Sequence, residues 1–445
     1  MMSNVNVGDK SKNGVNIIAA LVIVVTCGAF FFIDVPGGLT VRLIDVVELA
    51  MAAVVMKNCL VAPKVRTGLF PPWLFLVYCF FFALLILCPV LGIVVYDFEM
   101  GLMASSFRFM SFALLVWFCF QLKIDGRQAS RGLQRALVIA VIANFIYAVL
   151  QKMEFRGIIP WGALPHHYVT LWYQGAKFAD WGRTNGLFLN PNKLGWLGVT
   201  SYCVFFVGCL HGHRWHKLLA MISILLALLS NSRSAIFTIL GVTTVIIFVL
   251  AAEMVARGKS KKIVAVRIVE FILLLTAGGY AIWQWSAALF KIKRVMRFVR
   301  VASEGTQVDT SLTGRIQGHW QNGLNAVQLY PWGTGVDPVA CVGVIDSGWL
   351  SYWVQGGVVL FLAFATYLLS VGGYGLACYI KANDGYGLSL FALAVAIVVG
   401  SVVLSPFHHL PVFVVFHILL YVVMMNRKEQ TVYQTGWQSA KGCYL

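Results

Sequence analysis

Charged residues are scarce in this sequence. Only 11% of its 445 residues are Asp, Glu, Lys or Arg, whereas 60% are hydrophobic and 14% are aromatic. Soluble chains carry about 25% charged residues, so this chain has too few charges either to cover a water-facing surface or to stay unfolded in water. The shortage excludes a soluble enzyme, a disordered protein and a small secreted disulfide scaffold. It indicates a multi-pass membrane protein instead.

Common cofactor and metal motifs are also missing. The chain has neither a Walker-type Gly-rich loop nor a dinucleotide-binding fingerprint. Its ten cysteines lie mostly in apolar runs and lack the spacing of metal ligands. We therefore expect no metal, no cofactor and no disulfide framework, and any reaction has to draw its energy from an already activated substrate.

The chain is instead rich in long apolar runs. A helix needs about 20 apolar residues to cross a bilayer. We count twelve such runs, which predicts an all-α, polytopic membrane protein with a single integral membrane domain over 1–445. The first run lacks a signal-peptide cleavage site and is expected to remain as a helix. The runs cover 15–33, 43–62, 72–95, 101–121, 133–151, 192–210, 215–231, 233–252, 264–284, 347–371, 386–404 and 411–425.

The formal net charge of +17 is a topology signal. In a soluble protein it would suggest nucleic acid, but Lys and Arg gather in the cytoplasmic loops of membrane proteins. With both termini placed in the cytoplasm, 20 of the 34 Lys and Arg residues and six of the 17 acidic residues fall inside. The outside is then nearly balanced, so basic residues found there at helix ends need a specific explanation.

Two predicted outside segments are long, 152–191 and 285–346, and loops of this length are usually functional. In the second, basic residues alternate with apolar ones over 291–300. On a helix this pattern gives one basic and one apolar face, as in segments that lie on a membrane surface. We expect short amphipathic helices there, which either anchor the loop or bind an anionic lipid.

Three arginines lie in predicted outer segments that lead into a helix or open one. Arg183 lies between Gly182 and a polar stretch that ends in Asn190 and Asn192, where an Asn is expected to cap the next helix. Arg233 follows a very short turn and opens the eighth helix, and Arg315 opens a polar helical stretch that includes Trp320. Helix N-termini favour phosphate, although solvated or snorkelling arginines would produce the same pattern.

Asp346 precedes the tenth apolar run and is the acidic residue at the junction between the second long loop and a membrane helix. It fits a helix N-cap, and beside several arginines it also fits a general base. His408 and His409 precede the last helix and fit a structural cap better than a substrate contact. His211, His213 and His216 resemble a metal cluster but fall in a cytoplasmic segment without an acidic or Cys partner, so we interpret them as a solvated basic loop.

Four segments of the chain resemble the O-antigen ligase and O-antigen polymerase superfamily in their order and spacing. They are RTNGLFLNPNKLG at 183–195, NSRSAIFTIL at 231–240, LTGRIQGHWQNGLNAVQLYPWGTGVD at 312–337 and DSGWLSYWVQGGVVLFLAF at 346–364. The resemblance covers residues 183–372, while the flanking helices match in number and apolarity alone.

The resemblance implies a class C glycosyltransferase architecture and metal-independent transfer of glycans from undecaprenyl diphosphate at the periplasmic face of the bacterial inner membrane. Arg183, Arg233 and Arg315 would bind the diphosphate, with Asn190, Asn192 and Trp320 as further substrate contacts. The partners would be a lipid-linked oligosaccharide donor and acceptor and membrane lipid, with a chain-length regulator protein as a further candidate and no nucleic acid.

One difference from the family pattern bears on whether the chain is a ligase or a polymerase. Ligases carry a His-Asn pair where this chain has Asp346-Ser347, and an acidic residue there is more typical of polymerases. We therefore expect a polymerase in which Asp346, Arg233 and Arg315 are catalytic. A ligase that transfers the glycan to lipid A core is the first alternative. A transporter of the same lipid is the second, although it would be expected to carry internal repeats and midplane charges.

Overall fold

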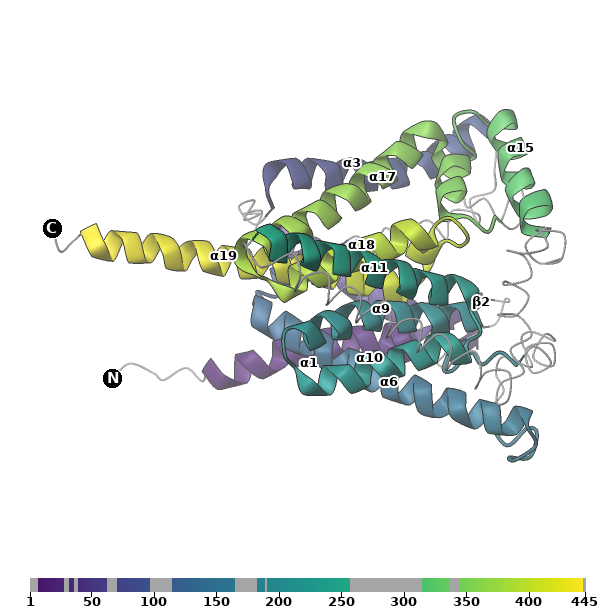
Figure 1. Ribbon diagram of the computed structural model, residues 1–445. Coiled ribbons are helices and arrows are strands. Elements are labelled where there is room, and N and C mark those ends of the chain that lie inside the picture. Colours follow the sequence, from purple (N-terminus) through teal and green to yellow (C-terminus); the bar gives the residue numbers. More distant parts are fainter. Residues whose placement is uncertain are drawn as a thin grey trace.

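The structure is a computed structural model that describes residues 7–27, 32–35, 39–61, 70–96, 114–164, 182–188, 190–256, 314–335 and 345–442. These residues form a bundle of helices that run roughly parallel or antiparallel to one another (Figure 1). Both chain termini lie at one end of the bundle, which we call the terminal end. We call the opposite end the loop end.

The described elements are helices, apart from two short strands near the N-terminus. The first half contains α1 (Val7–Cys27), β1 (Phe32–Val35), β2 (Leu39–Arg42), α2 (Leu43–Val61), α3 (Pro72–Tyr96), α5 (Leu115–Gln121), α6 (Gly126–Phe155) and α9 (Pro191–Leu210). The second half contains α10 (Arg214–Leu229), α11 (Arg233–Ala256), the π-helix η5 (Arg315–Trp320), α15 (Gln321–Leu329), α17 (Gly348–Ala382), α18 (Gly385–Gly400), the 3-10 helix η6 (Pro406–His408) and α19 (Leu410–Gly442).

Six helices of the described residues are long and apolar enough to cross a membrane: α3, α6, α9, α11, α17 and residues 410–428 of α19. Two shorter apolar helical segments, 13–26 of α1 and 385–400 of α18, accompany them. The chain is thus a multi-pass membrane protein, as its composition indicates. The expected helix at 264–284, most of the one at 101–121 and the amphipathic stretch at 291–300 lie outside the described residues.

The expected helix over 15–33 is wrong at its end. Helix α1 stops at Cys27, and Phe32–Val35 forms a strand that pairs antiparallel with Leu39–Arg42, with Phe32 opposite Arg42 and Val35 opposite Leu39. Phe, Ile and Val favour strands, and a short apolar run cannot by itself distinguish a strand from the end of a buried helix. The fold is therefore all-α apart from one hairpin.

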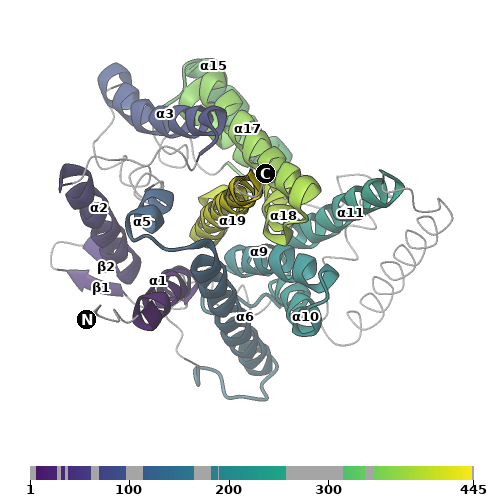
Figure 2. The ribbon, with the colours of Figure 1, turned by 90° about the vertical axis from the view of Figure 1, so that its left-hand side faces the viewer.

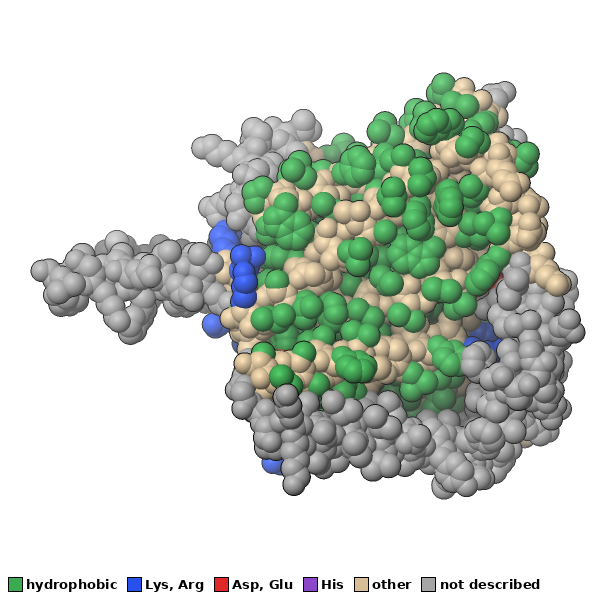
Figure 3. Space-filling view, turned by 45° about the horizontal axis from the view of Figure 1, so that its top comes forward, with side chains coloured by type: hydrophobic (Ala, Val, Ile, Leu, Met, Phe, Trp, Pro, Cys, Tyr) green, Lys and Arg blue, Asp and Glu red, His purple; other side chains and the backbone are tan. Residues whose placement is uncertain are grey.

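Apolar side chains that point outward cover the face of the bundle shown in Figure 3, with the visible Lys and Arg side chains at its margins. Among the described residues, large apolar side chains that are more than half exposed include Leu76, Phe80 and Val94 of α3, Phe248 of α11 and Leu369 of α17. In water such a surface would cause aggregation. It is the surface expected of helices whose outer faces contact lipid.

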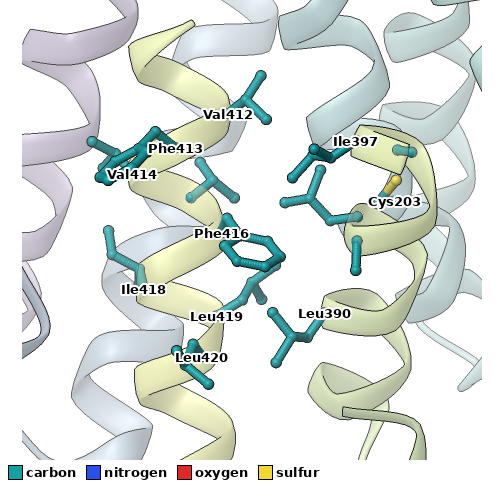
Figure 4. Packing of buried hydrophobic residues seen from close by; sticks show 14 of the residues in the cluster. Cys203, Leu390, Ile397, Val412, Phe413, Val414, Phe416, Ile418, Leu419 and Leu420 are labelled. Carbon is teal, nitrogen blue, oxygen red and sulfur yellow. The ribbon is translucent and has the colours of Figure 1, made fainter. Parts of the chain in front are cut away.

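The interior of the bundle is built around α19. Its residues from Val412 to Met424 are almost completely buried, and Figure 4 shows Phe416 and Leu419 facing Leu390 and Ile397 of α18. Rings from several helices surround the same region: Phe81 of α3 stacks on Tyr367 of α17 at 4.9 Å between ring centroids. A core this continuous fixes the relative positions of the helix ends.

Three helices start together at the loop end. Helices α9, α10 and α11 are joined by short turns, so α9 and α11 both begin there. Helix α17 begins beside the end of α18, because Gly348 N donates to Ser401 O at 2.8 Å. Trp196, in the second turn of α9, packs against Gly400, where a Cβ atom would lie 2.2 Å from its ring. The N-termini of α9, α11 and α17 thus converge on the C-terminal end of α18.

Candidate functional site

The loop end is organised by the segment 182–188, which is held on the last turns of α6. Gln151 of α6 is buried; its Oε1 accepts from Gly186 N at 3.0 Å and its Nε2 donates to Asn185 Oδ1 at 2.9 Å. Asn144 Oδ1 accepts from Leu187 N at 2.9 Å. Buried polar groups need such partners, so these two amides of α6 fix the path of the segment that carries Arg183.

Arg183 connects two helix ends. Its Nε donates to Ser230 O at 3.1 Å, at the end of α10, and its Nη2 donates to Asn192 Oδ1 at 2.6 Å, in the first turn of α9. The next residue repeats the link, since Thr184 N and Oγ1 both donate to Leu229 O. The guanidinium is therefore positioned between the start of α9 and the turn that leads into α11.

The start of α9 follows the expected capping pattern. Asn190 is the N-cap and accepts from Asn192 N at 2.8 Å, and Pro191 stands at the first helical position. Asn192 thus has two roles, because its backbone completes the cap while its side chain accepts from Arg183. The prediction of an Asn cap before this helix is confirmed.

Arg233 is the first residue of α11, as predicted from the short turn before it. The turn carries Ser230, Asn231 and Ser232, with Asn231 in a left-handed conformation at φ 49°. Its approach to α9 is close, since a Cβ atom at Gly195 would lie 2.8 Å from both Ser230 Oγ and Ser232 Cβ. Arg183 and Arg233 thus lie on either side of one tight contact between α9 and the α10–α11 turn.

Asp346 is not the cap of α17. Ser347 takes that position and its Oγ accepts from Leu350 N at 3.3 Å, while also donating to Ser401 O at 3.1 Å. A capping hydroxyl can donate and accept at once, whereas an ionised carboxylate can only accept, and Ser347 Oγ does both. The cap interpretation of Asp346 is therefore wrong. Its side chain is half-buried.

The stretch that begins at Arg315 is helical, as expected, and is fastened to α17. Helix α15 contributes Ala326 to a small buried cluster with Ile345, Leu350 and Val354, and Trp320 packs against this cluster. Trp320 Nε1 is shielded from solvent and makes no hydrogen bond within the described residues. Arg315 is thereby placed at the loop end, on a helix docked beside Asp346, although its side chain lies outside the described part of the chain.

A glycine-rich turn completes this docking. Helix α17 is broken at Gly356 and Gly357, which have non-helical dihedral angles. The carbonyl groups of Val354 and Gln355 accept instead from Thr334 N and Gly335 N, both at 2.7 Å. The break therefore supplies the acceptors that hold the η5–α15 unit. The apolar run 347–371 gives no indication of this role for the two glycines.

Two further basic residues reach the loop end that the sequence pattern does not single out. Lys152 Nζ of α6 donates to Gly182 O at 2.6 Å, directly beside Arg183 in the chain. Lys193, in the first turn of α9, lies close enough to His409 to act on its charge. The first could have been anticipated, because Lys152 follows directly on the apolar run 133–151. The second requires knowledge of how α9 meets α19.

His409 lies just before α19, and the expectation of a plain cap does not account for it. Burial lowers the pKa of its ring to about 3, with Lys193 and His408 adding to the effect. Its Nε2 atom is shielded from solvent and has no hydrogen-bond partner within the described residues. The ring is therefore neutral at neutral pH, and a neutral imidazole offers one donor and one acceptor nitrogen.

The loop end thus brings Lys152, Arg183, Lys193 and Arg233 together from separate elements, with the helix that carries Arg315 docked nearby and Asp346 at the start of α17. Three helix N-termini add partial positive charge there. Chemically, such an arrangement could bind an anion of more than one charge, with a carboxylate and an imidazole on neighbouring elements.

No family model matches this chain, and none of the curated proteins compared with it matches its sequence.

Proposed function

We propose that the chain is a glycosyltransferase that joins oligosaccharide repeat units linked to undecaprenyl diphosphate, working at the periplasmic face of the bacterial inner membrane. The observation that carries the proposal is the position of Arg183, bonded to both the start of α9 and the end of α10, next to Arg233 at the start of α11. A diphosphate is the common biological group that matches two guanidinium groups and helix N-termini at a membrane surface.

In the proposed reaction, a hydroxyl group at the non-reducing end of the acceptor attacks the anomeric carbon of the donor's reducing-end sugar. A new glycosidic C–O bond forms while the bond between the anomeric carbon and the diphosphate oxygen breaks, and its electron pair leaves with undecaprenyl diphosphate. The hydroxyl proton passes to a base, for which Asp346 is the proposed group. The product is one longer glycan on the acceptor lipid and one free undecaprenyl diphosphate.

The arginines would act on the leaving group. Negative charge builds up on the diphosphate as the bond breaks, and fixed guanidinium groups stabilise that charge without having to reorganise. Removing one donor of this type typically slows a reaction by about 10²–10³-fold. The mechanism needs neither a metal nor a nucleotide, in keeping with the missing motifs.

The test uses the purified full-length protein in liposomes with lipid-linked repeat units and no energy source. A polymerase makes a ladder of longer lipid-linked glycans. The matched variants are Arg233→Ala, expected to abolish the ladder while the protein still inserts and folds, and Arg131→Ala, an exposed arginine of α6 near the terminal end, expected to leave it unchanged.

A ladder of normal length from Arg233→Ala would overturn the proposal. Adding lipid A core to the same liposomes separates the two transferases, because a ligase moves glycan onto the core while a polymerase does not. A transporter produces neither product and changes only the side of the membrane on which the lipid-linked glycan is found.

A further inference from the structure

A pocket of about 470 Å³ lies at the terminal end of the bundle, away from the candidate site. It is formed where α9 ends and α10 begins, where α17 ends and α18 begins, and by the first turns of α6. Figure 2 looks onto this end and shows α6, α9, α10 and α18 beside one another. The volume falls in the usual range for small-molecule sites, about 300–1,000 Å³.

The pocket gathers the three histidines of the α9–α10 region around a cation from α6. Its lining includes Arg127, His211, His213, His216 and Asp384. The rings of His213 and His216 lie 5.0 Å apart between centroids. Since His211 Nδ1 lies 3.0 Å from Val207 O and a carbonyl only accepts, Nδ1 carries the proton and Nε2 is left for another contact.

The sequence expectation that these histidines have no acidic partner is wrong. The turn between α17 and α18 brings Asp384 into the same pocket. Its Oδ1 accepts from Tyr386 N at 3.0 Å, and burial raises the pKa of this carboxyl, although His211 acts in the opposite direction. Asp384 therefore serves as the cap of α18. Because its carboxylate accepts this backbone hydrogen bond, it repels a bound anion less than a carboxylate without such a bond would.

Helix ends add positive potential to the same place. Helices α6, α10 and α18 all begin at the pocket. Asp125 caps α6 and Asp384 caps α18, but His213, at the cap position of α10, makes no side-chain capping hydrogen bond. The N-terminus of α10 therefore faces the histidines without a carboxylate of its own.

The groups that line the pocket favour an anion over a metal ion. The guanidinium of Arg127 repels a metal ion, and the described residues contain no group of three or more His, Cys, Asp or Glu side chains placed to hold one. Arginine, histidine N–H groups and a helix N-terminus are together the usual partners of phosphate.

The exposed residues of α10 indicate that the pocket is at the level of lipid headgroups. Trp215, the second residue of α10, is 78% exposed. Leu218 and Met221 further along the helix are at least half exposed. A tryptophan at the end of an apolar helical face marks the membrane–water interface. A phosphate bound in the pocket would thus be level with the phosphates of the adjoining leaflet.

We propose that this pocket is a second anion site that binds a phosphate group through Arg127, His213, His216 and the start of α10. The phosphate belongs either to the headgroup of an anionic lipid or to a small soluble phosphate compound. The site is independent of the glycosyl transfer proposed at the loop end, because the two lie at opposite ends of α9.

The experiment measures binding to the purified full-length protein in a neutral detergent by calorimetric titration. One arm uses inorganic phosphate, the other short-chain phosphatidic acid, and short-chain phosphatidylcholine serves as the comparison lipid. Saturable binding of phosphate and phosphatidic acid supports a soluble as well as a lipid source, and binding of phosphatidic acid alone assigns the site to lipid. Absence of saturable binding in both arms overturns the proposal.

Two variants test the place of binding. Arg127→Gln is expected to weaken binding about tenfold or more, since an arginine–phosphate contact is charge-assisted and often bidentate. Arg131→Gln removes the same charge from the same helix. Both arginines are exposed, but Arg131 does not line the pocket, so this variant is expected to leave the affinity within about twofold. Equal weakening by both variants would mean general attraction to a basic surface and would contradict the proposal. Should Arg127→Gln fail to fold, His213→Gln takes its place with the same expected direction.

Discussion

Arg183 illustrates what the sequence neighbours of one residue can and cannot indicate. Its position between glycines and a polar stretch marks it as a candidate for anion binding, and nothing local separates that interpretation from a solvated side chain. The contacts with Ser230 O and Asn192 Oδ1 join residues far apart in the sequence. Only the packing of α10 against α9 brings those acceptors to one place.

Asp346 and His409 have surroundings that differ from those the sequence favours. From the sequence, Asp346 fits a helix cap as well as a general base, but Ser347 caps α17 and also donates to Ser401 O. The sequence treats His409 as a cap, but its Nε2 atom is shielded and unpartnered within the described residues. In both cases the surroundings are set by contacts between elements far apart in the chain, through Ser401 for Ser347 and through burial for His409.

At the residue scale, His409 predicts how stability depends on pH. Its pKa is about 3 in the folded protein and about 6.5 in an unfolded chain, so between these values the unfolded state binds the extra proton. Stability is complete above about pH 6.5 and falls as the pH is lowered, by up to about 2 kcal/mol at pH 5. Thermal unfolding of the purified protein at a series of pH values measures this.

The control for this prediction is His409→Gln, which cannot take up the proton and is expected to show a shallower fall in unfolding temperature between pH 6.5 and pH 5. Identical pH profiles for the two proteins would mean that the imidazole does not carry the effect.

The apolar runs predict the bounds of most of the described helices closely. The runs at 72–95, 192–210 and 233–252 correspond to α3, α9 and α11 with nearly the same bounds. Their length is set by the bilayer and their ends by polar residues, both of which are local properties. The hairpin at residues 32–42 was missed because a short apolar run fits a strand as well as a helix.

The break in α17 was also missed, because a pair of glycines within an apolar run is compatible with a continuous helix. The break is fixed by a partner: the turn that contains Gly333 and Gly335 supplies donors to the carbonyl groups of Val354 and Gln355. Gly357 has φ 64° and ψ −167°, a region that is almost exclusive to glycine.

We predict that Gly357→Ala lowers the free energy of unfolding by roughly 2–3 kcal/mol, because the backbone conformation becomes strained and the new Cβ would lie 2.9 Å from Pro331 O. The same substitution is expected to release the η5–α15 unit and reduce glycan transfer, since that unit carries Arg315. Denaturant titration and the transfer assay measure the two effects.

The matched control is Gly373→Ala in the same helix, where a Cβ meets nothing within 4 Å. Alanine is favoured over glycine in a helix by about 1 kcal/mol, so this variant is expected to be as stable as the parent or more so. Destabilisation of equal size in both variants would contradict the role of the break.

At the scale of the whole molecule, the distribution of Lys and Arg predicts the orientation. The terminal end is expected in the cytoplasm and the loop end outside. We predict that Trp161→Cys, exposed after α6 at the loop end, reacts with a membrane-impermeant maleimide in intact cells. Arg214→Cys, exposed at the start of α10, is expected to react only after the membrane is opened.

The parent protein without either new cysteine gives the background labelling. Labelling of Arg214→Cys in intact cells, with Trp161→Cys protected, would reverse the orientation and place the arginines of the loop end in the cytoplasm, where the proposed reaction could not use a periplasmic substrate.

The sequence alone indicated that this chain is a membrane protein and where most of the described helices lie, and it indicated that Arg233 and Arg315 open helices. These follow from local composition, because burial in lipid and helix capping depend on neighbouring residues. Only the tertiary structure shows that α9, α11 and α17 begin together, that Ser347 and not Asp346 caps α17, and that Asp384 joins three histidines in the pocket at the terminal end. Those facts depend on contacts between helices far apart in the chain, and the pattern of apolar runs contains no information about which helix packs against which.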